Sequence, residues 1–288
     1  QMVDGMNIRT PRGSLSELNY RVTPYSGGSD HMMFIDRKIP GVMFVHGPDY
    51  THHTSEDTPD KVDPVELERS EVIAAGTVFF LANLEPNQAL DLVYLAAASS
   101  TQRIGEAGRR ALQIVLNSPF DQIPPKTGEA LIVIEENTRL EKEGLATTMW
   151  FNDEEQVRRA VEVFQKQADV HARVLADEVN QSAASRLGKK SVAVPSGIVD
   201  KRVPVRLTRG PLDFGLPESK LSEAERASSS SRYRLSGDVR FEIVNFIDGK
   251  RTIAEIERAL IGEFGRDAIV GFDRYIEDVV KVGVVRWK

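Results

Sequence analysis

The residues best suited to chemistry lie between Ser29 and Pro64. Four of the five histidines of the 288-residue chain fall in this stretch, at positions 31, 46, 52 and 53, with carboxylates between them. Imidazole and carboxylate groups are zinc ligands in proteins, and the chain has no cysteine. No two histidines have the His-Glu-x-x-His spacing, and the adjacent His52 and His53 are expected to point in different directions. The stretch therefore predicts either a zinc site that uses one of these two side chains or a solvated loop.

The order of short blocks within this stretch favours the zinc site. The blocks are Ser29-Asp30-His31, Phe34, Ile39-Pro40-Gly41, His53-Thr54-Ser55-Glu56-Asp57-Thr58 and a helix expected after Val62. In this order they resemble the C-terminal signature of the zinc-dependent aminopeptidase family, which includes bacterial leucyl-type aminopeptidases, glutamate carboxypeptidase II and glutaminyl cyclase. The resemblance covers roughly residues 20–85.

The resemblance implies a metallopeptidase that hydrolyses peptide bonds with water activated by two zinc ions. His53 would be the last protein ligand of this site, because Thr54 and Asp57 keep the family spacing after it. The family has an aromatic residue directly before the ligand histidine, where this chain has His52. The resemblance therefore favours His53 as the zinc ligand but leaves the choice between the two imidazoles open.

Other residues of the stretch are expected to support the metal site rather than to bind zinc. By the resemblance, Asp30 and His31 would lie at the rim of the site, where they orient ligands or substrate. Tyr50 and His52 would also lie beside the ligands or the peptide substrate. The family also implies export to the periplasm or the extracellular space, while the preferred side chain and the cleaved end of the peptide stay open.

The remaining ligands of the family come earlier in its chain, in the order His, bridging Asp, a Glu-Glu pair and Asp. Residues 1–28 contain no histidine, and Glu135-Glu136 follows His53, so that pair reads as charged surface. We therefore expect the C-terminal part of such an enzyme, with no catalytic residue of its own and with the general-base glutamate upstream of Gln1. The alternative is a non-catalytic peptide- or protein-binding protein that keeps the peptidase scaffold.

The elements that would position these residues form an α/β unit in residues 1–85. A short helix is expected to end before Pro40, and residues 41–46 read as a buried strand of a parallel or mixed sheet. After a polar loop, Asp63-Pro64 opens a capped helix that runs to about Asn83. The predicted fold class is thus α/β, with the C-terminal part of a mixed-sheet zinc-peptidase domain at the start of the chain.

The rest of the chain divides into three predicted regions. Residues 86–187 form a helical region, with helices over 86–117 and 154–187, a strand at 131–134, and His171 as a packed histidine. Residues 188–231 read as an extended linker that packs in part on its neighbours, and residues 232–288 as a small module of three helices and a terminal strand. This module resembles the winged-helix modules that are used for protein or peptide contacts.

Composition excludes some function classes. The net charge of −6 argues against a general nucleic-acid binder, and residues 232–288 carry 11 Lys or Arg against 10 Asp or Glu, so they lack a basic stripe. No apolar run reaches the length of a membrane span. The first residue is Gln1 and no signal peptide is visible, which fits a chain cut from a longer protein.

Overall fold

The computed structural model describes residue 18 and residues 20–23, 27–47, 49–195, 199–208, 216–223 and 233–288. The chain divides into two compact units, residues 1–85 and residues 86–288. The described residues are mainly helical, and their only sheet has two strands. None of the described helices is long and apolar enough to span a membrane.

The first unit contains α1 (His31–Asp36), a 3-10 turn (Pro59–Lys61) and α2 (Pro64–Ala82). α2 begins as the sequence predicts, because the Asp63 carboxylate accepts hydrogen bonds from the Val65 N–H at 2.8 Å and the Glu66 N–H at 3.4 Å. The N-cap of α1 is Asp30.

The predicted α/β fold class is wrong for the described residues. Residues 41–46 have no regular secondary structure, and Val42 and Val45 are 84% and 77% exposed. An apolar run becomes a buried strand only when neighbouring strands pair with its backbone, and the described residues of the first unit contain no strand. The described part of residues 1–85 therefore does not form the expected mixed sheet.

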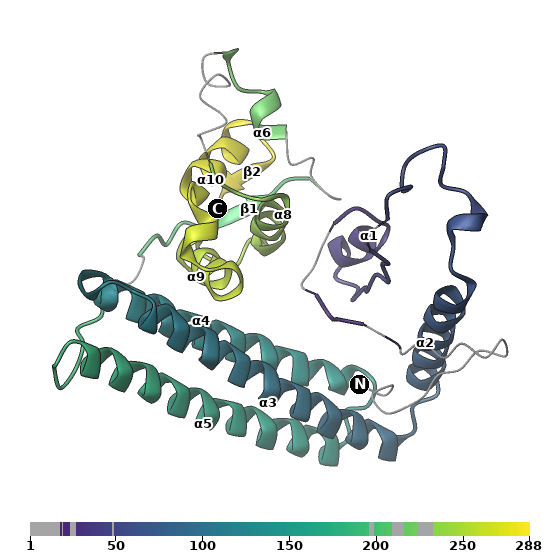
Figure 1. Cartoon of the computed structure of the whole chain (residues 1–288), viewed down its shortest axis with the longest axis horizontal. Helices are drawn as coiled ribbons and strands as arrows, with labels where there is room; N and C mark the ends of the chain where they lie inside the picture. Colours follow the sequence, from purple (N-terminus) through teal and green to yellow (C-terminus); the bar gives the residue numbers. More distant parts are fainter. Residues whose placement is uncertain are drawn as a thin grey trace. The chain divides into compact units, whose positions relative to one another are not determined.

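The second unit begins with three long helices, α3 (Pro86–Leu116), α4 (Ile123–Ala146) and α5 (Glu155–Arg186), which lie side by side (Figure 1). Short 3-10 turns, Phe120–Gln122 and Thr147–Trp150, join them. The core of this bundle is made mostly of small and β-branched side chains, which allow the helices to approach closely: Ala111, Val115, Ile123, Ala130, Ile134, Val179 and Ala183.

The strand predicted at residues 131–134 is also wrong, since this run lies within α4. A short apolar run does not distinguish a buried strand from a buried helix segment by its period alone. Here the run is apolar all round because α4 is covered on two sides. Ile134 belongs to the bundle core, whereas Ile132 belongs to the core of the C-terminal helices.

The C-terminal module, residues 233–288, contains α8 (Gly237–Phe246), α9 (Ile253–Phe264), a 3-10 turn (Arg266–Ile269), α10 (Phe272–Lys281) and β2 (Val285–Trp287). β1 (Pro204–Arg206) pairs antiparallel with β2, with Val205 opposite Arg286. A four-residue helix, α6 (Leu216–Ser219), precedes the module. The three helices and the terminal strand were expected from the sequence, but β1 was not, because it lies in the predicted linker.

The segment before β1 packs on the module through hydrogen bonds and an ion pair. The first N–H groups of α9, on Ile253 and Ala254, donate to the carbonyls of Arg202 and Asp200 at 2.9 and 3.0 Å. The Arg202 guanidinium lies 4.3 Å from the centroid of the Trp287 ring and binds Glu277 at 2.6 Å. This part of the predicted linker therefore belongs to the fold of the module. The serine run at 228–231 lies outside the described residues.

Candidate metal site

The loop that precedes α2 is shaped by Asp49. One carboxylate oxygen of Asp49, Oδ1, accepts hydrogen bonds from the Thr51 N–H, the Thr51 hydroxyl and the His52 N–H, each at 3.0 Å. The bond from the Thr51 N–H is the largest of the effects that lower the pKa of Asp49, followed by the bond from the Thr51 hydroxyl. Asp49 therefore stays ionised as the cap of the turn that carries His52 and His53.

The two adjacent histidines do not point in different directions. Their rings are stacked, with centroids 3.8 Å apart and planes 25° apart. His53 has a left-handed backbone, with φ at +62°, a conformation in which histidine is found more often than most residues. This backbone turn reverses the usual alternation of neighbouring side chains and brings His53 against His52.

Thr54 fixes the other side of this loop. Its hydroxyl donates to the Thr51 carbonyl at 2.6 Å and accepts from the Glu56 N–H at 3.2 Å. The Thr58 hydroxyl donates to Asp60 Oδ1 at 2.5 Å, just before the 3-10 turn that leads to α2. Local hydrogen bonds thus set the loop from position 49 to position 60.

The predicted rim residues, Asp30 and His31, lie together at the start of α1, whereas Tyr50 lies on the loop before α2. His31 is the first residue of α1 and Asp30 is its N-cap. A Cβ atom at Gly41 would lie 3.5 Å from the Cβ of His31, so residue 41 folds back onto the start of α1. Tyr50 is 87% exposed on the loop.

The residues present do not form a zinc site by themselves. Within the part of the chain that the structure describes, no group of three or more His, Asp or Glu side chains is arranged to hold a metal ion. A zinc ion in a peptidase site needs three protein ligands. His53 and the residues around it can therefore contribute at most part of such a site.

The first unit also lacks an apolar core among its described residues. Arg69, which binds Glu66 at 2.6 Å, is the only buried residue among them. Large apolar side chains that would normally be covered are half or more exposed: Met33, Phe34, Ile39, Val42, Phe44, Val45, Leu67, Val72, Val78 and Phe79.

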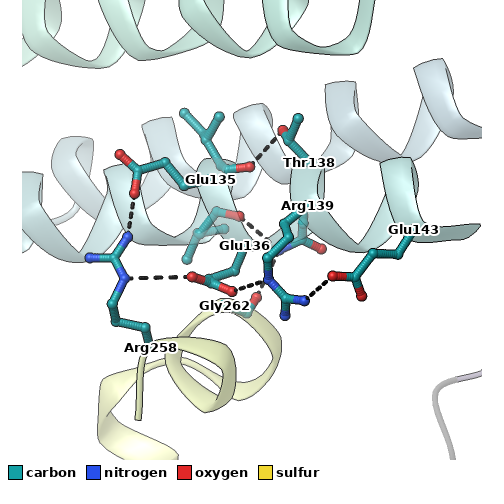
Figure 2. A network of polar contacts seen from close by, with 10 residues as sticks. Glu135, Glu136, Thr138, Arg139, Glu143, Arg258 and Gly262 are labelled. Carbon is teal, nitrogen blue, oxygen red and sulfur yellow. Dashed lines mark hydrogen bonds and ion pairs between the residues drawn. The ribbon is translucent and has the colours of Figure 1, made fainter. Parts of the chain in front are cut away.

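The Glu135-Glu136 pair lies on α4 and takes part in ion pairs (Figure 2). Glu135 binds Arg258 of α9, and Glu136 binds Arg139 at 2.9 Å and Arg258 at 3.5 Å. The side chain of Glu136 is only 12% exposed, so the prediction of a charged surface is wrong for this residue. Sequence reasoning missed the arginine from α9 because 123 positions separate it from Glu135.

His171 lies on the side of α5 that faces α3. A Cβ atom at Gly105 of α3 would be 3.9 Å from the Cε1 atom of His171. The side chain is half-buried, as expected for a packed histidine. It belongs to the helical bundle of the second unit, whereas the other four histidines belong to the first unit.

Comparison with known families adds the decisive observation. Residues 9–78 match peptidase family M28. Peptidases of this family are generally zinc-dependent, so the match supports the relation to zinc peptidases that the sequence blocks predict. The match covers 70 of the 288 residues and contains every predicted site residue. Neither a curated protein nor a solved structure matches the chain.

Proposed function

We propose that this chain is part of a zinc-dependent peptidase of the aminopeptidase type, with the first unit forming one edge of its site. The observation that carries the proposal is the match of residues 9–78 to peptidase family M28. Its substrate would be a peptide from which terminal residues are removed. Export, which the family resemblance implies, is part of the same proposal.

Within this site, His53 is the zinc ligand. Three features of the loop support this assignment: the hydrogen bonds of Asp49 and Thr54 on either side, the left-handed backbone at His53, and the exposure of His53 to solvent. The stacked ring of His52 would hold the His53 imidazole in place. Asp30, His31 and Tyr50 would lie where the substrate meets the site.

The other zinc ligands and the general-base glutamate would come from protein outside this sequence. Two observations support this part of the proposal. The described residues hold no cluster of three potential ligands, and the described residues of the first unit leave large apolar side chains uncovered. A neighbouring part of a peptidase domain would supply the ligands and cover these side chains together.

A second candidate is a non-catalytic binding protein that keeps a remnant of the peptidase scaffold. The observation in its favour is that the well-packed cores lie in residues 86–288, in the bundle and in the C-terminal module. In this proposal the module is winged-helix-like and makes protein contacts, and the first unit binds a peptide without cleaving it.

One comparison separates the two candidates. The sequence encoded upstream of Gln1 is read for a His-x-Asp block, a Glu-Glu pair and a further Asp, and the protein expressed with that sequence is assayed on aminoacyl-anilides. The peptidase proposal expects these blocks and hydrolysis that a zinc chelator abolishes. A protein that lacks the blocks and binds peptides without hydrolysing them would be the non-catalytic candidate.

A further inference from the structure

The contact between α4 and α9 joins the bundle to the C-terminal module. Ile132 of α4 is part of the same apolar cluster as Ile256, Leu260 and Ile261 of α9. A single turn of α4 therefore serves two cores, with Ile134 turned to the bundle and Ile132 to the module. Ile132 is only 8% exposed, so its burial against α9 contributes hydrophobic stabilisation to this contact.

Gly262 allows the two helices to approach this closely. A Cβ atom at this position would overlap the Cβ of Glu136 and lie 3.2 Å from its Cγ. Gly262 lies inside α9, where glycine costs about 1 kcal/mol of helix stability relative to alanine. The close crossing of α4 and α9 explains why this helix carries a glycine near its end.

The bundle also completes the C-terminal end of α9. Asn137 of α4 donates from Nδ2 to the Gly262 carbonyl at 2.8 Å. Arg110 of α3 donates to the carbonyls of Gly262 and Glu263 at 3.3 and 3.4 Å. The last carbonyls of a helix lack partners within it and carry the negative end of its dipole, so a cationic donor is well suited to this place.

Ion pairs and a buried carboxylate extend the contact on both sides. On one side, Arg258 binds Glu135 and Glu136 (Figure 2). On the other, Glu129 of α4 is 5% exposed, accepts from the Arg266 N–H at 3.1 Å and binds Lys126 at 2.9 Å. A buried carboxylate whose partners come from both the bundle and the module would be costly to expose or to leave unpaired.

We propose that α9 acts as a shared helix, so that the bundle and the C-terminal module unfold as one cooperative unit. A partner that binds the module then stabilises the bundle as well, because the two cannot separate without losing the contacts of α9. This inference does not depend on the peptidase proposal, since it concerns residues 86–288 alone.

The two tryptophans of the chain allow the two halves to be followed separately. Trp150 lies in the turn between α4 and α5, and Trp287 lies in β2 of the module. In a Trp150→Phe background, the fluorescence of Trp287 follows the module, while far-UV circular dichroism follows mainly the three long helices. Urea unfolding is expected to give the same midpoint with both probes.

The coupling is tested by Ile276→Val in the core of the module, where Ile276 is 1% exposed and distant in sequence from the bundle. If the halves unfold together, the midpoints of both probes fall by the same amount. A fall that is confined to the Trp287 signal, or separate midpoints in the parent protein, would overturn the proposal.

The role of the joint is tested by Gly262→Ala, with Gly144→Ala of α4 as the matched control. A Cβ atom at Gly144 meets nothing within 4 Å. Gly262→Ala is expected to lower the midpoint of the Trp287 signal, whereas Gly144→Ala leaves it unchanged or raises it. Equal midpoints for the two variants would refute the role of Gly262. If the Gly262→Ala protein does not fold, Asn137→Ala takes its place, because it removes the hydrogen bond to the Gly262 carbonyl without introducing a clash. The same fall in the midpoint of the Trp287 signal is then expected, and a midpoint equal to that of Gly144→Ala would refute the role of the joint.

Discussion

At the scale of single residues, short-range hydrogen bonds place most of the side chains that matter. Asp49 and Thr54 hold the histidine loop, and Asp63 caps α2. These contacts join residues two or three positions apart, so the sequence alone predicts the Asp63 cap correctly. The stacking of His52 on His53 was not predictable, because it depends on the left-handed backbone at His53. Glycine is the residue that usually signals this conformation in a sequence, and this position is a histidine.

The reciprocal cap of α9 gives the first prediction. The Thr252 hydroxyl accepts from the Glu255 N–H at 3.3 Å, and the Glu255 carboxylate accepts from the Thr252 N–H at 2.7 Å. We expect Thr252→Ala to lower the free energy of unfolding by about 1 kcal/mol, measured by urea denaturation. Thr252→Ser keeps the hydroxyl and should retain most of that stability. Equal losses in the two variants would show that the cap is not the cause.

The same cap predicts a dependence on pH. The hydrogen bond from the Thr252 N–H, and then that from the Thr252 hydroxyl, lower the pKa of Glu255 below its ordinary value of 4.5. Because the folded state has the lower pKa, the stabilisation is present above the unfolded value and is lost as the pH falls through the folded value.

Denaturation midpoints at about pH 6 and about pH 3 test whether the stabilisation by Glu255 is lost as the pH falls. The parent protein should lose more stability between these two conditions than Glu255→Gln, which cannot titrate at this position. A larger loss in Glu255→Gln than in the parent would contradict the assigned shift.

At the scale of elements, long periodic helices were predictable and short apolar runs were not. The helices expected over 86–117 and 154–187 are α3 and α5, because many apolar residues at spacings of three and four define them. The runs at 41–46 and 131–134 were both predicted as strands. The first has no strand to pair with among the described residues, and the second is buried on two sides of α4. Neither fact can be read from the run itself.

Ile134, which lies in the run misassigned as a strand at 131–134, is expected to contribute strongly to the stability of the bundle. Ile134 is 1% exposed among the helices of the bundle. Ile134→Ala should lower the free energy of unfolding by about 2–5 kcal/mol, because it leaves a cavity. Val170→Ala on α5, where the side chain is 52% exposed, should change it by less than about 0.5 kcal/mol. Similar losses in both variants would contradict the assignment of Ile134 to the core.

At the scale of the whole molecule, the chain combines a helical part that has its own cores with a first unit whose described residues form none. The family relation was predictable because the blocks from Ser29 to Thr58 are local in sequence. A complete metal site was not predictable, because its ligands come from distant parts of the sequence and are brought together only when the domain folds. The described residues accordingly bring no three ligands together around His53.

The central claim is that His53 is a zinc ligand of a peptidase site completed by protein upstream of Gln1. The most direct test is the zinc content, by elemental analysis, of the protein expressed with all the sequence encoded upstream, compared with its His53→Ala variant and with His46→Ala as a control for a neighbouring histidine. We predict bound zinc in the parent protein and in His46→Ala, and a clear loss of zinc and of aminoacyl-anilide hydrolysis in His53→Ala. A His53→Ala protein that keeps full zinc and full activity would contradict the assignment.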